Sequence, residues 1–172
     1  MLSPKMVEHL NRQINLEFFS SNLYLQMSAW CENKGLEGCA TFFKNHAAEE
    51  MGHMHRLFQY VNETGALALI GEIAAPESEF SSIKEVFEKT YEHEVTVTKR
   101  INELADAAFV DKDYSTFNFL QWYVAEQHEE ETLFKGILDK FEMFGAEGPA
   151  LFHIDREIGG MAQATTEAPA SE

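Results

Sequence analysis

Apolar residues recur at steps of three and four along most of this chain, which is the spacing of one face of an α-helix. Ser3-Pro4 is a typical helix start, and the pattern predicts a first helix that ends near Asn33, ahead of Lys34-Gly35. A second helix is expected over 37–64, with Gly65 as a left-handed cap at its carboxyl end. The chain therefore opens with a predicted pair of long helices joined by a short turn.

Residues 66–81 show neither a helical nor a strand period and contain Gly71 and Pro76, so we expect an irregular connection. Sixteen extended residues reach roughly 53 Å, whereas a helix of 28 residues is about 42 Å long. The connection is therefore long enough to return along the whole length of a bundle. The helices before and after it can run parallel to each other.

The helical period appears twice more in the second half of the chain. Ser82 and Glu85 form a capping-box pattern that opens a third helix, which is expected to run to about Ala108. The turn 111–113 separates it from a fourth helix that stops at Gly145. The sequence thus predicts a second pair of long helices with a short turn.

The end of the chain is less regular. Residues 149–158 fit a short fifth helix, and the small polar residues 161–172 are predicted to be a disordered C-terminal tail beyond a single domain, 1–160. Four long helices, two short turns and one long crossover are typical of an all-α fold, a four-helix bundle with one long crossover connection. The fifth helix is an addition at the C-terminal end.

One glutamate interrupts the apolar stripe near the middle of each predicted long helix: these residues are Glu17, Glu50, Glu94 and Glu130. Glu50 and His53 are three residues apart and therefore lie on one helix face, as do Gln127 and Glu130. Packing of the helices in a bundle brings mid-helix positions to one level. We therefore expect these side chains to converge inside the core.

A single buried carboxylate is explained by a neutral acid hydrogen-bonded to a neighbour, and one Glu-x-x-His pair by a hydrogen-bonded core pair. Four converging carboxylates cannot be explained in this way, because desolvation and mutual repulsion disfavour them unless cations lie between them. Their charge of −4 is neutralised by two divalent ions. Hard oxygen ligands with one imidazole and no thiolate suit Fe(II) or Mn(II) better than a structural zinc site.

The amino-acid composition and the net charge limit the classes of function that the sequence is compatible with. The 172 residues are 45% hydrophobic with 14 Phe, which is enough for a substantial core. With 13 Lys and Arg against 29 Asp and Glu, the net charge is −16, which argues against binding to nucleic acid or to an anionic membrane. A negative net charge attracts cations, although the requirement for solubility alone also explains such a charge. No run of about 18 apolar residues and no signal-peptide pattern is present, so no membrane association and a cytoplasmic location are predicted.

Two cysteines, Cys31 and Cys39, flank the first predicted turn. They are too few for a disulfide framework, and we expect reduced thiols, although the two side chains are placed where they can approach each other.

With these residues in view, the chain resembles the bacterial non-haem ferritins, members of the ferritin-like di-iron family, over nearly its whole length. The strongest stretches are 15–17, 26–30, 46–53 and 118–131, which read Asn-Leu-Glu, Gln-Met-Ser-Ala-Trp, His-Ala-Ala-Glu-Glu-Met-Gly-His and Asn-Phe-Leu-Gln-Trp-Tyr-Val-Ala-Glu-Gln-His-Glu-Glu-Glu. The resemblance implies a hollow shell of 24 subunits. Each subunit takes up Fe(II), oxidises it with O2 or peroxide at a di-iron ferroxidase centre, and the shell stores ferric oxyhydroxide.

The resemblance also implies a ligand set: Glu17, Glu50 and His53 for the first iron, and Glu50, Glu94 and Glu130 for the second. Gln127 is expected alongside, as a weak ligand or a hydrogen-bonding neighbour. Other ferritin-like di-iron bundles carry a second Glu-x-x-His at this place, whereas this chain has Gln127-His128-Glu129-Glu130. An amide and a carboxylate thus replace a carboxylate and an imidazole.

Three further acids, Glu49, Glu126 and Glu129, each lie one residue from a predicted ligand. By resemblance they form, with Glu130, a third iron site on the side that faces the cavity of the shell. The alternative is a solvated acidic face, which is the usual nature of glutamate-rich runs.

Tyr24 lies one heptad after Glu17 on the same stripe. The resemblance implies that its phenol donates an electron during oxygen reduction, whereas its position alone also fits a core aromatic that hydrogen-bonds a carboxylate. The two roles are compatible. His46 is interpreted as a hydrogen-bonded neighbour rather than a ligand, and Trp122 as packing.

Two alternative functions stay open. In bacterioferritins a methionine between the Glu and the His of this motif ligates haem, and Met51 occupies that place. The histidine that bacterioferritins carry in the fourth helix is missing from this chain, so we expect no haem. A non-catalytic acidic helical interaction bundle is a different class. It predicts a small oligomer and no stoichiometric uptake of iron.

Overall fold

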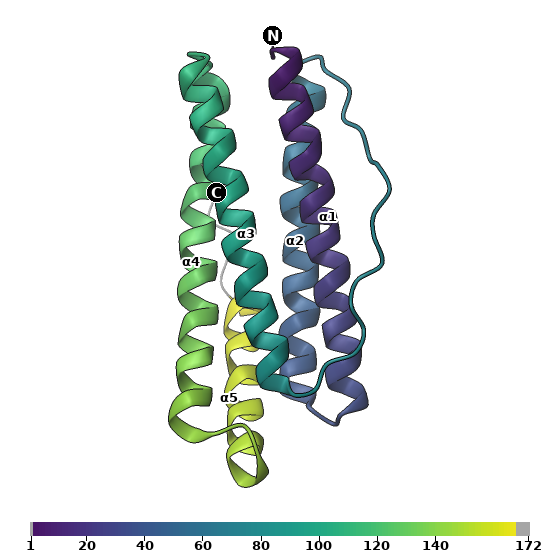
Figure 1. Cartoon of the computed structure of the whole chain (residues 1–172), viewed down its shortest axis with the longest axis vertical. Coiled ribbons are helices and arrows are strands. Elements are labelled where there is room, and N and C mark those ends of the chain that lie inside the picture. Colours follow the sequence, from purple (N-terminus) through teal and green to yellow (C-terminus); the bar gives the residue numbers. More distant parts are fainter. Residues whose placement is uncertain (1, 168–172) are drawn as a thin grey trace.

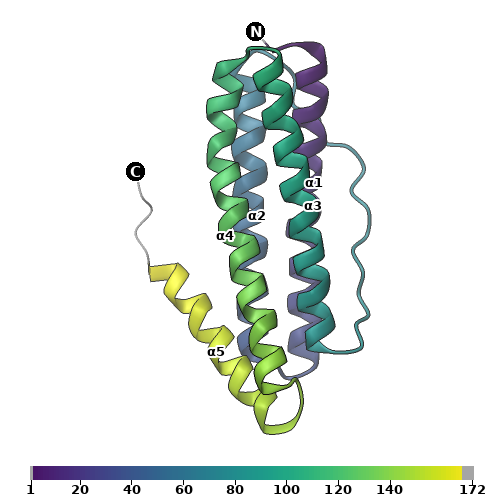
Figure 2. The same cartoon turned by 60° about the vertical axis from the view of Figure 1, so that its left-hand side comes forward.

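The structure is a computed structural model that describes the backbone of residues 2–167 and the side chains as far as residue 162. Five helices make up the described part of the chain, and no strand occurs in it: α1 (Pro4–Asn33), α2 (Glu37–Glu63), α3 (Ile83–Val110), α4 (Tyr114–Phe144) and α5 (Gly148–Glu167). The first four are long parallel and antiparallel rods in one bundle, and α5 lies obliquely across one end (Figures 1 and 2). The predicted all-α bundle is confirmed.

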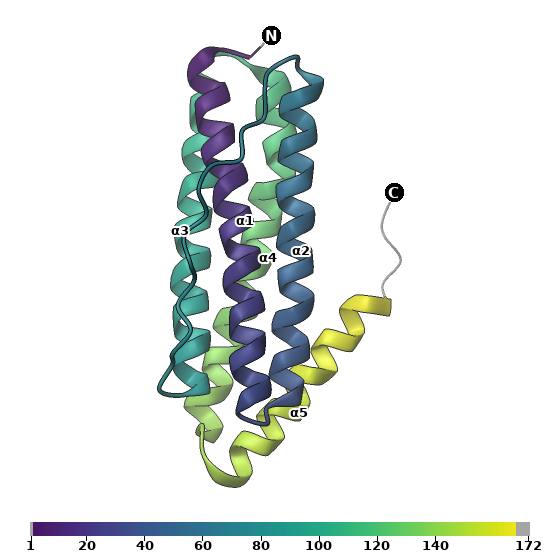
Figure 3. The same ribbon diagram turned by 90° about the vertical axis from the view of Figure 1, so that its right-hand side faces the viewer.

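The crossover between α2 and α3 runs along the outside of α1 for the length of the bundle (Figure 3). Asn11 accepts from the Leu69 amide at 2.9 Å and donates to the Leu67 carbonyl, and Asn15 does the same for Gly71 at 2.7 Å and Leu69 at 2.9 Å. These side chains satisfy backbone groups that have no helix or sheet of their own. Because the crossover returns along the length of the bundle, α2 and α3 run in the same direction, as the length of the connection allows.

Local capping sets most of the helix ends. Ser3, Ser82 and Asp113 each accept a hydrogen bond from a backbone amide of the first turn, and Gly65 adopts a left-handed φ of +81°. The expected capping box differs in one detail, because Glu85 accepts from the amide of Ser81 at 2.6 Å. The predicted ends of the four long helices are otherwise confirmed.

Apolar side chains form two clusters, one toward each end of the bundle. The first is built around large aromatic residues, which include Tyr24, Phe43, Phe87 and Phe134. The second is mostly aliphatic and includes Ile14, Leu57, Ile101 and Leu120. Buried polar side chains occupy the level between them. The core thus holds a polar layer in place from both sides.

The last helix is longer than the sequence pattern predicts. It was expected over 149–158, with a disordered tail from 161, but α5 continues to Glu167. Ile154, Ile158 and Ala162 are buried at four-residue spacing, and Asn45 donates to the Ala162 carbonyl at 3.1 Å. The helix therefore continues because its next turn packs on α2. The rest of the expected tail, 168–172, lies outside the described residues.

The crossing of α5 over α2 depends on close backbone approach. Asp155 accepts from the amides of Gly38 at 3.1 Å and Cys39 at 2.9 Å, so a side chain of α5 caps the start of α2. A Cβ at Gly38 would lie 1.9 Å from the Asp155 carbonyl oxygen, and one at Gly159 would lie 2.9 Å from the Gly38 Cα. Cys31 and Cys39 lie buried beside this crossing as free thiols.

Candidate metal centre

Six polar side chains converge in the layer between the two apolar clusters, and none is more than 6% exposed: Glu17 from α1, Glu50 and His53 from α2, Glu94 from α3, and Gln127 and Glu130 from α4. All four long helices thus contribute to one level of the core. The convergence arises because each residue interrupts the apolar stripe of its helix at mid-height.

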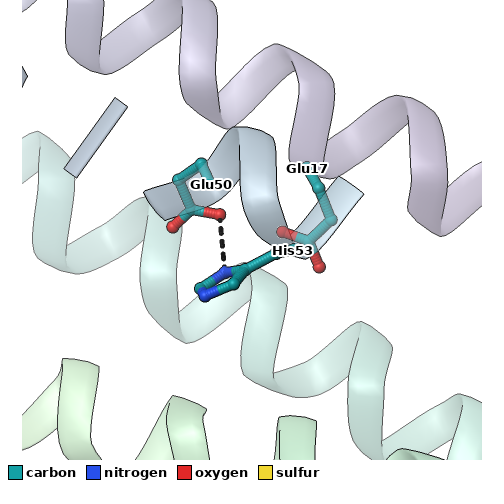
Figure 4. Close-up of side chains that lie close together, drawn as sticks. All are labelled: Glu17, Glu50 and His53. Atoms are coloured by element: carbon teal, nitrogen blue, oxygen red, sulfur yellow. Dashed lines mark hydrogen bonds and ion pairs between the residues drawn. The ribbon is translucent and has the colours of Figure 1, made fainter. Parts of the chain in front are cut away.

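Glu17, Glu50 and His53 form the tightest group, with ligand atoms within 4.8 Å of one another. Figure 4 shows Glu50 and His53 side by side on α2, with Glu17 approaching from α1. His53 Nδ1 lies 3.2 Å from Glu50 Oε2, and Gln13 Nε2 donates to Glu17 Oε1 at 2.8 Å. The other oxygen of Glu17 is buried and accepts no hydrogen bond from the described residues.

Glu94 is held by two donors. The Tyr24 hydroxyl donates to Glu94 Oε1, and Gln127 Nε2 donates to Glu94 Oε2 at 2.9 Å. Gln127 therefore acts as a donor to a carboxylate in this structure, which fits the expected role of neighbour. Tyr24 is fully buried, with its ring 6.1 Å from that of Phe43. The phenol thus lies directly against one of the expected ligands.

Glu130 is the least satisfied carboxylate of the layer. Its Oε2 is buried and accepts no hydrogen bond from any described residue, and His46 Nε2 lies 3.7 Å from it. His46 Nδ1 lies 3.1 Å from the Phe42 carbonyl oxygen, so the predicted hydrogen-bonded neighbour is present. However, His46 also forms a group within 4.8 Å with Glu49 and Glu130. The three-residue step from His46 to Glu49 is the sequence signal for this group.

Glu126 and Glu129 occupy other positions. Glu126 Oε1 is 3.9 Å from His53 Nε2 and partly buried, and Glu129 is exposed on α4. The structure brings neither of them into the two compact groups described above. Of the three acids expected at a third site, only Glu49 therefore lies in a compact group.

Burial is the largest cause of the altered acidity in this layer. It raises the pKa of Glu17, Glu50 and Glu130 well above the ordinary carboxyl value, and the neighbouring carboxylates raise it further. Burial also raises the pKa of Glu94 and lowers that of His46. A divalent cation in this layer would offset the desolvation and the repulsion that raise these pKa values. The two oxygens without donors, together with the carboxylate and imidazole ligands, fit such a cation.

The backbone and ring of His53 are fixed from α4. Tyr123 donates to the His53 carbonyl at 2.8 Å, and the Trp122 indole meets the imidazole edge-on with centroids 5.2 Å apart. The guanidinium of Arg56 lies over the Trp122 ring, 4.3 Å from its centroid. Trp122 thus packs against a candidate ligand, as expected, and Arg56 covers its outer face.

No helix in the described part of the chain is both long and apolar enough to cross a membrane.

Comparisons of the sequence with a family model and with individual proteins identify the same family. A family model, the ferritin-like domain of the Ferritin family, matches residues 7–144. A bacterial non-heme ferritin-like protein of Haemophilus influenzae is 60% identical over 162 residues, which cover 94% of this chain and 98% of the relative. The bacterial non-heme ferritin of Escherichia coli O157:H7 is 55% identical over 158 residues, 92% and 96% of the two chains.

Solved structures agree. The open pore ferritin of the archaeon Archaeoglobus fulgidus superposes with a TM-score of 0.90 at 43% identity, covering 92% of this chain and 98% of the other. The ferritin of Chlorobium tepidum superposes with a TM-score of 0.83 at 53% identity, covering 92% and 97%. The chain that places four buried glutamates at one level of its bundle therefore belongs to the ferritin family.

Proposed function

We propose that this chain is the subunit of an iron-storage ferritin and that it oxidises Fe(II) at the layer of buried carboxylates. The observation that supports the proposal most directly is the meeting of four buried glutamates, two of which have an oxygen without a donor among the described residues. An arrangement of this kind is stable only when protonated or when it holds cations. The family and the relatives named above supply iron as the cation.

The proposed ligand set is the one that the sequence predicts, and the compact group of Glu17, Glu50 and His53 supports it. Glu17, Glu50 and His53 would hold one Fe(II), and Glu50, Glu94 and Glu130 would hold a second. Burial and the neighbouring carboxylates raise the pKa of Glu17, Glu50 and Glu130, so binding of the ions is coupled to release of any protons that these groups hold. Each bound Fe(II) supplies one electron to O2 or peroxide. Anionic oxygen ligands favour the Fe(III) product, since they neutralise its additional charge.

The residues around the ligands have distinct proposed roles. Tyr24 and Gln127 hold Glu94 in one orientation, and Tyr24 is also the proposed electron donor, because its phenol contacts that carboxylate directly. We also propose that Glu49, Glu126 and Glu129, with Glu130, bind a third Fe(II) beside the centre, although only Glu49 and Glu130 of these acids lie in a compact group before an ion binds.

The assembled state is part of the same proposal. Large apolar side chains are exposed on α1, on the crossover and at the ends of the helices: these include Leu25, Leu67, Leu69, Phe109, Val110 and Met143. Exposed apolar surface of this extent favours association, and a shell of 24 subunits would cover it. The two free thiols agree with a cytoplasmic, reducing location.

The test compares Glu94→Ala with Glu92→Ala, a solvent-exposed glutamate on the same helix. Each protein receives about two Fe(II) per subunit without oxygen, and ferric absorbance is then followed in air. E94A should oxidise iron at least about tenfold more slowly, while E92A matches the unaltered chain. Particle mass should be that of the assembled shell for all three. Equal initial rates for E94A and E92A would refute the site.

Haem binding through Met51 is checked on the same purified samples. Met51 is partly buried against the aliphatic cluster. The prediction of no haem requires that no Soret band appears after incubation with haem and gel filtration.

A further inference from the structure

Two aromatic side chains that can lose an electron lie against the carboxylate layer, and they come from different helices. Tyr24 on α1 donates its phenol proton to Glu94 Oε1. Trp122 on α4 meets the His53 ring edge-on, with centroids 5.2 Å apart and ring planes at 75°. Both rings therefore contact a proposed ligand, so proximity alone does not decide which of them supplies an electron.

The surroundings of Tyr24 favour its oxidation. A phenol that loses an electron also loses its proton, and Glu94 Oε1 is already placed to accept it. No Lys or Arg side chain lies over the Tyr24 ring in the described part of the chain. The product of the loss is a neutral phenoxyl radical, which leaves no additional charge on the ring.

The surroundings of Trp122 are different because a cation covers the ring. The guanidinium of Arg56 lies 4.3 Å from the Trp122 centroid and 5.8 Å from that of Phe119. Although the chain has 29 acidic residues, this guanidinium forms no ion pair and no hydrogen bond with a described residue. Its charge is therefore directed at the indole and is not neutralised by a carboxylate in contact with it.

A guanidinium in this position makes the indole harder to oxidise. It attracts the electron-rich face of the neutral ring and repels the positive charge that the ring carries after losing an electron. The Trp122 N–H donates to no described residue, so no acceptor within the described chain is placed to take up its proton. Since a guanidinium stays protonated throughout the physiological pH range, the effect does not depend on pH there.

The position of the cation is set by the same helix that carries the ligand. His53 and Arg56 are three residues apart on α2, so they share a face, and both contact Trp122. Tyr123 packs edge-on against the indole with centroids 4.8 Å apart. The indole is therefore held between a proposed ligand and a positive charge.

We propose that Arg56 restricts electron donation by Trp122 and so leaves Tyr24 as the aromatic donor. The inference rests on the proposed function, because the oxidant is the O2 or peroxide of the iron reaction. In the step, Tyr24 passes one electron to that oxidant and its phenol proton to Glu94 Oε1, and no other bond forms or breaks. Arg56 acts through Trp122 and does not contact the substrate.

The effect of the charge is tested first without iron. Trp30→Phe leaves Trp122 as the single tryptophan of the assembled protein, and photoexcited riboflavin serves as an uncharged one-electron oxidant. Arg56→Met keeps a long side chain over the indole without its charge, whereas Arg56→Lys keeps the charge. Arg100→Met, at an exposed position of α3, is the control for the change in net charge.

Transient absorbance of the indole radical gives the rate of Trp122 oxidation. R56M should be oxidised about threefold faster than the protein with Arg56, and R56K and R100M should stay close to that protein. Equal rates for R56M and R56K would show that Arg56 only covers the ring, and would overturn the proposal.

The second test follows the radicals formed with iron. Each protein with both tryptophans present receives about two Fe(II) per subunit, is mixed with O2 and is freeze-quenched for electron paramagnetic resonance, with ring-deuterated tryptophan to assign the signals. The unaltered chain and R56K should show mainly a tyrosyl radical, and R56M a larger share of tryptophanyl radical. A mainly tryptophanyl signal in the unaltered chain, or equal shares in R56M and R56K, would contradict the role of Arg56.

The two tests separate this inference from the proposed function. Faster oxidation of Trp122 in R56M by riboflavin, in a protein that does not oxidise Fe(II), would leave the effect of Arg56 on Trp122 standing and remove the ferroxidase. Oxidation of Fe(II) with equal radical shares in R56M and R56K would do the reverse.

Discussion

The phenol of Tyr24 on α1 donates a hydrogen bond to Glu94 on α3, so one buried contact joins the two helix pairs at the level of the carboxylates. Gln127 donates to the other oxygen of the same carboxylate at 2.9 Å. Glu94 therefore keeps its orientation before any ion binds. This preorganisation distinguishes it from Glu130, whose Oε2 accepts no hydrogen bond from the described residues.

Tyr24→Phe removes that donor without changing the shape of the ring. It should destabilise the metal-free protein by about 1–3 kcal/mol, because a buried carboxylate oxygen is left unpaired, and it should slow Fe(II) oxidation at low loading. Urea denaturation and stopped-flow absorbance measure the two effects.

Tyr60→Phe is the control for that substitution, since the Tyr60 hydroxyl bonds Thr116 at 2.8 Å, away from the carboxylates. It should reduce stability by about 1 kcal/mol and leave oxidation unchanged. If Y24F oxidises iron as fast as Y60F, Tyr24 has no part in the reaction.

The raised pKa of Glu17 predicts how the free energy of unfolding of the metal-free protein depends on pH. Burial, and then the Glu50 carboxylate, raise the pKa of Glu17 well above its ordinary value. The folded chain binds this proton more tightly than the unfolded chain, so its contribution to stability falls as pH rises toward the raised pKa. Glu17→Gln removes the titration and should stabilise the metal-free protein increasingly with pH, by up to about 1.4 kcal/mol per pH unit.

Urea midpoints of the metal-free protein from about pH 5 to about pH 8 measure this trend, because the loss of stability begins just above the ordinary carboxyl pKa. The buried histidines titrate equally in E17Q and in the unaltered chain to a first approximation, so the difference between the two proteins isolates Glu17. Glu8→Gln, at an exposed position of the same helix, is the control and should show no comparable rise. A constant difference between E17Q and the unaltered chain from about pH 5 to about pH 8 would contradict the raised pKa.

Glu126 and Glu129 test the expected composition of the third site. If they help to hold a third iron, replacing both with alanine should change the number of Fe(II) ions oxidised per O2, because the electron from that iron is no longer supplied with the other two. Oxygen-electrode measurements at about three Fe(II) per subunit give the ratio. An unaltered ratio would remove both acids from the site.

The close backbone approach at Gly38 predicts that α5 cannot keep its position if a side chain is added there. A Cβ there meets the Asp155 carbonyl at 1.9 Å, so Gly38→Ala should displace α5 and lower the thermal unfolding temperature. Gly136→Ala is the matched control, because a Cβ at this helical position meets no other heavy atom within 4 Å. It should stabilise α4 by about 0.5–1 kcal/mol. A tolerated G38A variant with unchanged particle mass would show that the close crossing is not needed.

Local chemistry accounts for the parts of this structure that were predictable. Ser3 and Asp113 cap helices through bonds to amides three residues away, and Gly65 takes the left-handed conformation that ends α2. Interactions of this range depend on neighbouring residues alone, so the sequence pattern identifies them. The register of each apolar stripe likewise determined that Glu17 and Glu94 face inward at mid-height.

Tertiary structure decided the rest. The pairing of His46 with Glu130 depends on the separation of α2 and α4, which no helical period specifies. The last turns of α5 form because Ala162 is buried and its carbonyl accepts from Asn45 of α2, a partner 117 residues earlier in the chain. Periodicity determines which face of a helix is buried, whereas the distances between helices depend on all the side chains packed between them.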